Sequence, residues 1–516
     1  MRVAGAVHLL SLLAAAAQLT LAQESVFSSL AQNATYRSQA EFYIRDGPEA
    51  QHNKYLAALK FFNNLYQPEE LPKTALPLAI LKLHPKQEYD LSWLVEAARV
   101  TGIKISARSG GYHSAYASVL PVNGVKETPR EFVLVDLSSL KGITIDPKRK
   151  IAVVEPGVTG SELYDATAKY GLHFPGPHTS FVTIGGFLLQ GGMGFGSRLL
   201  GAGVDNVVGF EIITSRHNGR SLYVDANNYP DLFYAVRGGG QFFGVITKFH
   251  LKVYPIVDQP ALIPTYSAKT IKLETSFSIH DQKNFPAVLD FYKKFDPTAP
   301  KSVETKIVFI KDADANAQLL LSATSVAPFN SSASVTAALN EIESFNKNNG
   351  AFFESNAPTT YYDAVHGGDS SWSTPNLSYI AEDIWIATPL SDKVLKVISE
   401  VWAKAPSVLS SMFLNTGTWE APSSSALGFD PSYSLGIYST WVRNGDVKWD
   451  EANIQWLKDT VEALKPYTLG FYANEMQPRS DGDANYWRKC YQPDAWKKLN
   501  NAKAKWDSRR VFKDLQ

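Results

Sequence analysis

Glycines in the first half of the sequence have the spacing of a backbone site for an anion. Consecutive glycines after a strand allow successive backbone N–H groups to converge, as the binding of a pyrophosphate requires. The run Arg108-Ser109-Gly110-Gly111 has this form, with the arginine at its rim and a hydroxyl alongside. Gly185-Gly186 and Gly191-Gly192 leave room for a flat ring system, and a third cluster ends at Gly240. Each cluster alone fits an ordinary turn or a close helix–strand contact, but three in one lobe favour a binding site.

Other common catalytic signatures are missing from the sequence. There is no Walker A loop, no G-x-S-x-G elbow and no H-E-x-x-H pair, and residues 191–196 lack the G-x-G-x-x-G spacing of a Rossmann site. No Cys/His cluster has metal-ligand spacing, so we expect no metal. Cys490 is the sole cysteine, so an internal disulfide is excluded.

Strands and short helices are predicted around the glycine clusters. A helical face of apolar residues begins at Leu91 and stops at Gly102, and Asn218-Gly219 is a hairpin turn between two strands. Ser161 is expected to cap a short helix that ends at Gly171. The predicted strands span 78–83, 103–107, 132–137, 151–154, 207–214, 221–224 and 245–254.

The pattern of predicted helices and strands changes after about residue 256. Longer amphipathic helices are predicted there, and aromatic strand-like segments alternate with them. This pattern predicts an antiparallel sheet covered by helices, and hence an α+β fold. At 516 residues the chain is also too long for one ordinary core, so we expect two lobes. The predicted helices span 334–345, 392–404 and 450–464, and the predicted strands span 306–310, 379–388 and 433–442.

The balance of charge indicates the kind of partner. The sequence has 50 basic and 50 acidic residues, and no basic stripe is visible. Proteins that bind nucleic acid or a membrane surface normally show a basic excess. We therefore expect a small-molecule substrate and no nucleic-acid partner.

The first 22 residues resemble a secretory signal peptide. Arg2 is followed by an apolar run over 9–17 that is too short to span a bilayer, and cleavage is expected after Ala22. An uncleaved anchor is the alternative. Acceptor sequons for glycosylation begin at Asn33, Asn330 and Asn376. We expect a secreted or secretory-pathway protein with no membrane contact after cleavage.

An ordered set of motifs resembles one family. The set comprises Arg108-Ser109-Gly110-Gly111, Glu155-Pro156-Gly157-Val158, Thr183-Ile184-Gly185-Gly186, Asp231-Leu232-Phe233 with Arg237-Gly238-Gly239-Gly240, Phe243-Gly244-Val245-Ile246-Thr247, Phe471-Tyr472-Ala473-Asn474, Asn485-Tyr486 and Lys505-Trp506-Asp507 through Phe512. These motifs are similar to those of the berberine-bridge-enzyme-like, oxygen-dependent FAD-linked oxidoreductases. That family lies within the vanillyl-alcohol-oxidase flavoprotein superfamily.

The resemblance implies a two-lobed flavoprotein and a set of cofactor contacts. A PCMH-type FAD-binding domain is expected over 73–256, a substrate domain over 257–470, and a segment over 471–516 that returns to the flavin domain. The residues expected to contact FAD are Arg108, Ser109, Gly110, Gly111, Tyr112, His113, Ser114, His178, Thr179, Thr183, Gly185, Gly186, Gly192, Val245 and Asn474.

The sequence departs from the family where many members tether FAD twice. Thr179 stands at the position of the tethering cysteine, so a thioether link there is excluded. Tyr112 stands at the position of the tethering histidine, and His113 follows it. Attachment through His113 is one hypothesis, and an ordinary pocket histidine is the other. His178 is a candidate for a polar contact with cofactor or substrate, or a plain loop histidine.

Oxidation by a flavin also needs a side chain that accepts the proton of the substrate's O–H or N–H. Tyr438, Tyr472 and Glu475 are the candidates for this role. The resemblance places Tyr472 beside the flavin, where it acts as the base or only as a hydrogen-bond partner of the cofactor. A free tyrosine titrates near ~10, so a tyrosine base needs help from its surroundings.

These observations predict an oxidase that acts on a small organic molecule, a secondary metabolite, and passes electrons to O2. The alternatives are a secreted carbohydrate oxidase, a non-redox cyclase that uses FAD as a template, and a non-enzymatic flavin carrier.

Overall fold

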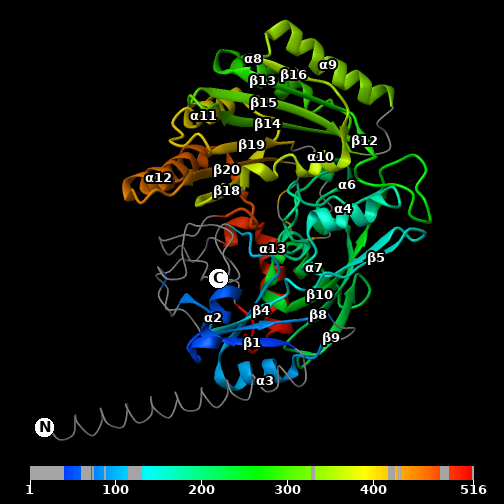
Figure 1. The fold of residues 1–516 in the computed structure, drawn as a ribbon, viewed down its shortest axis with the longest axis vertical. Helices are drawn as coiled ribbons and strands as arrows, with labels where there is room; N and C mark the ends of the chain where they lie inside the picture. The colour runs from blue at the N-terminus through cyan, green and yellow to red at the C-terminus, as the bar shows by residue number, and fades with distance from the viewer. Residues whose placement is uncertain are drawn as a thin grey trace, which may run out of the picture.

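The computed structural model shows two lobes stacked along the longest axis of the molecule (Figure 1). It describes residues 40–59, 71, 75–85, 89–113, 131–326, 332–372, 374–416, 425–427, 429, 432–476 and 487–513. Both lobes combine helices with sheets, so the predicted α+β class is confirmed. The expected signal peptide and the sequons at Asn33 and Asn330 lie outside the described residues.

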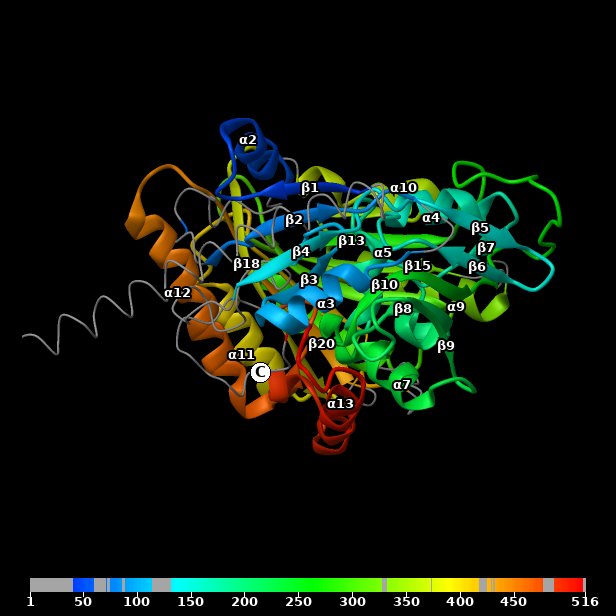
Figure 2. The same ribbon diagram turned by 90° about the horizontal axis from the view of Figure 1, so that it is seen from below.

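The first lobe contains two sheets (Figure 2). One mixes parallel and antiparallel pairs in the order β1 (Glu41–Ile44), β2 (Ala79–Lys82), β4 (Phe132–Asp136) and β3 (Lys104–Arg108). The other is antiparallel in the order β5 (Ile143–Asp146), β6 (Ile151–Val154), β10 (Val245–Lys252), β8 (Val207–Ile213) and β9 (Ser221–Asp225). The hairpin between β8 and β9 is confirmed, because Asn218 and Gly219 have φ angles of 52° and 76° and close the turn.

Short helices connect these strands. They are α2 (Glu49–Ala58), α3 (Ser92–Thr101), α4 (Gly160–Ala168), α5 (Ile184–Leu189), α6 (Ser197–Leu200) and α7 (Pro230–Gly239). The prediction that Ser161 caps α4 is wrong. Thr159 is the cap, because its hydroxyl accepts from the Glu162 N–H while the Glu162 carboxylate accepts from the Thr159 N–H. This capping box satisfies two N–H groups, and Ser161 lies inside the first turn.

The second lobe is built on an eight-stranded antiparallel sheet. Its strands, in spatial order, are β16 (Phe353–Ser355), β13 (Thr275–Asp281), β15 (Ala317–Ser325), β14 (Val303–Lys311), β19 (Ser411–Asn415), β20 (Ser432–Val442), β18 (Leu377–Ala387) and β21 (Thr468–Phe471). Small two-stranded pairs join β7 (Leu172–His173) to β11 (Tyr254–Pro255) and β12 (Lys272–Leu273) to β17 (Thr359–Thr360).

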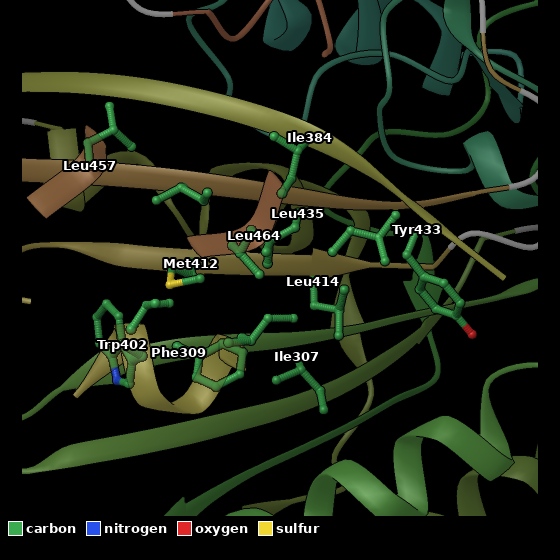
Figure 3. Packing of buried hydrophobic residues seen from close by; sticks show 14 of the residues in the cluster. Ile307, Phe309, Ile384, Trp402, Met412, Leu414, Tyr433, Leu435, Leu457 and Leu464 are labelled. Carbon is green, nitrogen blue, oxygen red and sulfur yellow. The ribbon is translucent and has the colours of Figure 1, made fainter. Parts of the chain in front are cut away.

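Helices cover one face of this sheet and pack against it to form the core of the second lobe. They are α8 (Phe285–Phe295), α9 (Ala333–Asn349), α11 (Asp392–Trp402) and α12 (Val447–Leu464), while α10 (Tyr361–His366) lies toward the first lobe (Figure 1). Phe309 of β14 packs against Trp402 of α11, with ring centroids 6.2 Å apart, and Ile307 and Leu414 join the same cluster (Figure 3). Because side chains alternate along a strand, the neighbours of these residues point away from the helices and toward the first lobe.

A buried ion pair joins the lobes. Arg198 of α6 and Asp296 at the end of α8 lie 2.8 Å apart, and both side chains are fully buried. Asp296 also accepts from the hydroxyl of Tyr433 at 2.9 Å. This network fixes the glycine-rich segment before α6 against the second lobe.

The end of the chain returns to the first lobe. Helix α13 (Pro493–Trp506) packs against α7, and Lys503 donates to the carbonyl of Phe242 at 2.6 Å and to Asp507 at 2.6 Å. Phe512 then forms an isolated bridge with Ile105 of β3. Among the helices of the described residues, none is long and apolar enough to cross a membrane.

Candidate active site

A cavity of about 1200 Å³ lies between the free face of the eight-stranded sheet and the loops of the first lobe. This is larger than the ~300–1,000 Å³ of most small-molecule sites, so it has room for a large cofactor together with a substrate. Tyr112, His178 and Thr179 contribute to the cavity wall from the first lobe, and Tyr438 and Asp383 from the second.

The loop after β3 has the conformation of a backbone cradle. Gly111 has a φ of +77°, which side chains rarely adopt. An added Cβ at Gly110 would lie 2.3 Å from the ring of Tyr112, so this ring packs directly onto Gly110. Arg108 is not at the rim of the cradle as expected, because its guanidinium lies in the lobe interior and binds Asp136 at 2.5 Å. Arg108 therefore anchors the loop to β4.

The second glycine cluster lies directly beside this loop. Ser109 accepts from the Thr183 hydroxyl at 3.0 Å and from the Gly186 N–H at 3.1 Å. An added Cβ at Gly185 would lie 2.9 Å from the Ser109 hydroxyl and 2.8 Å from Pro156. The structure therefore brings the first two glycine clusters together, although Ser109 and Thr183 are 74 residues apart in sequence.

His113 and Tyr112 follow the cradle and approach the end of the chain. The His113 ring interacts with the carbonyl of Ala473 through Nε2 at 2.9 Å, and burial lowers the pKa of this histidine. Tyr112 packs on Phe181 with ring centroids 5.3 Å apart, and its carbonyl accepts from the Tyr379 hydroxyl at 2.8 Å. Ser114 lies outside the described residues.

Thr179 and His178 line the cavity on its first-lobe side. The sole cysteine, Cys490, is buried with Trp487 in the apolar core of the first lobe and is not among the residues that line the cavity within the described ranges. His178 interacts through Nε2 with Glu304 of β14 at 2.6 Å and so joins the two lobes.

Tyr472 contacts both lobes with its backbone and its hydroxyl. Its oxygen accepts from the backbone N–H groups of Gly192 at 2.8 Å and Met193 at 3.1 Å. The side-chain amide of Asn474 donates to the same oxygen at 3.1 Å and to the carbonyl of Phe187 at 2.9 Å. Burial raises the pKa of Tyr472, although these donors lower it. The phenol therefore stays protonated near neutral pH and serves to hold the glycine segment.

Glu475 and Tyr438 form a hydrogen-bonded pair in the cavity wall. Burial raises the pKa of the Glu475 carboxyl to about 7, although the hydrogen bond from Tyr438 lowers it. Burial, followed by the charges of Glu475 and Asp383, raises the pKa of Tyr438. A carboxyl that titrates near neutral pH beside a protonated phenol has the properties of a general base.

Asp383 is a site residue that the sequence did not reveal. It lies inside the long buried strand β18, where its carboxylate accepts from the Ser434 hydroxyl at 2.8 Å. Burial raises the pKa of Asp383, the Ser434 hydrogen bond lowers it, and the nearby acids Glu475 and Glu382 raise it further. An acidic pair inside an otherwise apolar strand, Glu382-Asp383, was the signal available in the sequence.

Val245, which was predicted to contact the cofactor, and the third glycine cluster, which was expected to belong to the binding site, have structural roles instead. Val245 is fully buried in the core at the start of β10, where it pairs with Ile213. Gly238 packs against the backbone of Leu427, and its carbonyl accepts from the Tyr491 hydroxyl at 3.0 Å. The third glycine cluster thus supports the C-terminal segment, and it is not part of the cavity wall among the described residues.

The residues present fit an FAD molecule. Gly110 and Gly111 are partly exposed, and the φ of +77° at Gly111 gives the loop the conformation of a backbone cradle, so this loop and the neighbouring Thr183–Gly186 backbone would hold an anionic diphosphate. Tyr112, Thr179 and Phe181 offer apolar and small surfaces in the adjoining cavity wall for a flat ring.

Comparison with known proteins agrees with this arrangement. Residues 79–222 match the FAD binding domain family. An FAD-linked oxidoreductase of Dictyostelium discoideum is 38% identical over 143 residues, which are 28% of this chain and 31% of the relative. Berberine bridge enzyme-like 11 of Arabidopsis thaliana is 31% identical over 194 residues, 36% of this chain and 34% of the relative. The matched region thus spans about a third of the length of these curated relatives.

The fold of the whole chain is similar to that of a solved structure. BBE-like 1 of Physcomitrella patens superposes with a TM-score of 0.74 at 18% identity, over 94% of this chain and 98% of that one. The likeness therefore extends over both lobes and includes the sheet that covers the cavity.

Proposed function

We propose that this FAD-binding chain is an oxidoreductase of the berberine-bridge-enzyme-like kind, which removes hydride from a small organic substrate. The observation that carries this proposal is the Glu475–Tyr438 pair in the cavity wall, with a carboxyl that titrates near neutral pH. When bound, FAD would supply the hydride acceptor, with O2 as the proposed final electron acceptor.

The residues of the chain have separate tasks in this proposal. Glu475 accepts the proton of the substrate O–H or N–H at its carboxylate, and Tyr438 holds that carboxylate in place through its hydroxyl. Tyr472 positions the backbone of Gly192 and Met193 against the C-terminal segment. The two lobes enclose the site, which excludes water from the reacting groups.

We expect the protein to be secreted or to lie in the secretory pathway. Its substrate is expected to be a secondary metabolite. The N-terminal residues through Ala22 support secretion, as does the exposed turn position of Asn376 at the start of β18. A mature N-terminus at Gln23 and a glycan on Asn376, both detected by mass spectrometry of protein from the native host, are the expected findings.

Carbohydrate oxidation is a second candidate, which the sheet face of the cavity favours. Ser322 and Thr324 of β15 offer hydroxyl groups there, and the ring of Phe277 on β13 stands directly opposite Ser322. Rings next to hydroxyl groups suit a molecule that has apolar faces and polar edges.

Anaerobic reduction is the experiment that tests the proposal. We expect purified protein to be yellow, to bleach when a screened metabolite or sugar is added without air, and to recolour with air while peroxide is released. Glu475→Gln should slow bleaching by ~10²–10⁴-fold, the usual contribution of a general base. The control is Glu211→Gln on β8, whose carboxylate pairs with Lys248 at 3.1 Å outside the cavity.

Other outcomes would replace the proposal. Turnover without bleaching or peroxide would indicate a non-redox cyclase, and a yellow protein inert to every substrate would indicate a carrier. Unchanged bleaching by Glu475→Gln would remove the base from the mechanism.

A further inference from the structure

A row of polar side chains crosses the sheet face of the cavity, away from Glu475. Lys306 of β14 stands opposite Ser322 of β15 on one side and opposite Asn415 of β19 on the other. All three residues line the cavity. Directly opposed side chains in antiparallel strands have Cβ atoms ~4.5–5.5 Å apart. An ammonium, a hydroxyl and a carboxamide therefore present hydrogen-bond donors side by side.

None of these three side chains makes a hydrogen bond or ion pair within the part of the chain that the structure describes. Ser322 is only 7% exposed, and Lys306 and Asn415 are partly buried. Polar groups at a half-buried site normally have partners. Convergent polar groups in a cavity wall are also the usual means by which a ligand is oriented.

The other charged groups around this row are already paired. Glu304 is two residues from Lys306 on the same face of β14, and its two oxygens interact with His178 at 2.6 Å and the Gly196 N–H at 2.7 Å. Arg198 is bound to Asp296, and Lys311 donates to the carbonyl of Ala405.

Lys272 also interacts within the chain. Of the lysines and arginines that line the cavity in the described ranges, Lys306 is thus the one that makes no hydrogen bond or ion pair, although its charge helps to lower the pKa of the nearby Glu304 carboxyl.

We infer that the substrate carries a carboxylate, which Lys306 binds with the help of Asn415 and Ser322. The inference rests on the proposed function, since it assigns the far end of the molecule that Glu475 deprotonates. Charge-assisted hydrogen bonds are about twice as strong as neutral ones, so a carboxylate uses this row better than a hydroxyl does. A cationic substrate group is disfavoured by the same charge.

The register also sets the shape of the substrate. Asn415 pairs with Ser434 and Ser411 pairs with Tyr438, so the Lys306 row and the Tyr438 row are four residues apart along β19. With ~3.4 Å per residue and ~4.8 Å per strand, the Cα atoms of Lys306 and Tyr438 are roughly 17 Å apart. The carboxylate and the oxidised carbon therefore lie at opposite ends of the substrate and are not neighbouring atoms, as they are in a 2-hydroxy acid.

Equilibrium binding of simple probes tests the inference. FAD-loaded protein is titrated with phenylbutyrate and with its neutral amide, and binding is followed by calorimetry and by the change in flavin absorbance. We expect the carboxylate to bind at least ~10-fold more tightly than the amide, and Lys306→Met to remove this preference, a change of ~1.4 kcal/mol. Affinity for the amide should not change.

Two further variants keep the result interpretable. Lys306→Arg retains the charge and should retain most of the preference, which distinguishes lost charge from a damaged fold. Lys311→Met is the matched control, because it removes a lysine of the same strand that is already paired, and it should change carboxylate affinity by less than ~2-fold.

Equal affinity of wild-type protein for acid and amide would overturn the inference, and so would equal weakening of both ligands by Lys306→Met. These results are separable from failure of the proposed function. FAD-loaded protein that no substrate bleaches refutes the oxidoreductase, whereas calorimetry on the same protein still measures the carboxylate preference.

Discussion

The buried carboxyl of Glu475 makes a prediction about stability that needs no substrate. Burial raises the pKa of this carboxyl from 4.5 to about 7. The folded protein therefore binds a proton between these pH values that the unfolded chain releases, so stability falls as pH rises. Each pH unit in this window contributes ~1.4 kcal/mol, and the whole loss is ~3 kcal/mol.

Glu475→Gln removes the titration but retains an oxygen that accepts from Tyr438. Relative to the variant, wild-type protein should be ~3 kcal/mol less stable at pH 8 than at pH 4.5, with the change complete just above pH 7. The assay is urea unfolding of both proteins across this range, with equal and saturating FAD and with refolding checked. Comparison at each pH cancels the titrating groups whose pKa does not depend on Glu475.

Glu304→Gln is a control with the opposite sign. Burial raises the pKa of Glu304, but His178 and the Gly196 N–H outweigh burial and hold it below its usual value. Glu304 therefore stabilises the fold above pH 4.5 and loses this effect as pH falls. A stability difference between wild type and Glu475→Gln that is flat with pH, or that rises with pH, would refute the reasoning about Glu475.

Three further predictions concern the lobe junction and the cofactor. Arg198→Met should cost ~3–5 kcal/mol in urea unfolding because Asp296 is left charged and buried, and the double variant Arg198→Met/Asp296→Leu should recover most of this; equal cost in both would contradict a buried-charge origin. Tyr472→Phe should cost ~1–3 kcal/mol for each N–H that loses its acceptor and should weaken FAD retention on gel filtration, whereas unchanged retention would separate Tyr472 from the cofactor site. If His113 is the single tether, acid precipitation should leave the flavin with wild-type protein and release it from His113→Ala; release from wild type would rule the tether out.

Local signals in the sequence located most of the first lobe. The hairpin at Asn218-Gly219 needed only turn chemistry, because both residues adopt positive φ angles. The start of α4 shows the limit of such signals. Ser161 and Thr159 are both acceptable caps, and the choice depends on Glu162, which completes a capping box only with Thr159.

The second lobe was predicted in class but not in full. Strand β15 carries Ser322 and Thr324 on the cavity face, and β13 carries Ser276 and Ser278 on the face toward α9, so their apolar alternation is weak, and neither strand was predicted. The first strand, β1, and α2 were missed because β1 has only four residues and α2 has few apolar residues, and contacts such as the pairing of β1 with β2 and the burial of Tyr55 order them. Tertiary contacts decided these elements, which a window of sequence does not contain.

The site itself was recoverable only in part. Arg108 stands in a motif that suggests a phosphate ligand, but its ion pair with Asp136 depends on a strand 24 or more residues away, β4. Glu304 and Lys306 stand in a strand that reads as alternating polar and apolar, with nothing to mark one polar face as a cavity wall. That face acquires its meaning when the first lobe covers it.

The short segment that carries Glu475 links the sheet of the second lobe to the glycine-rich backbone of the first lobe. The Tyr472 N–H donates to the Asp383 carbonyl at 2.9 Å, and the Asp383 N–H donates to the Glu475 carbonyl at 2.8 Å, so the backbone after β21 continues its pairing with β18. Side chains on this same short segment reach the other lobe, because the Tyr472 hydroxyl holds the Gly192 N–H. A change that loosens the segment therefore moves the proton acceptor and the glycine backbone together. Loss of the proton acceptor alone requires a substitution as conservative as Glu475→Gln, and this is why that variant separates chemistry from architecture.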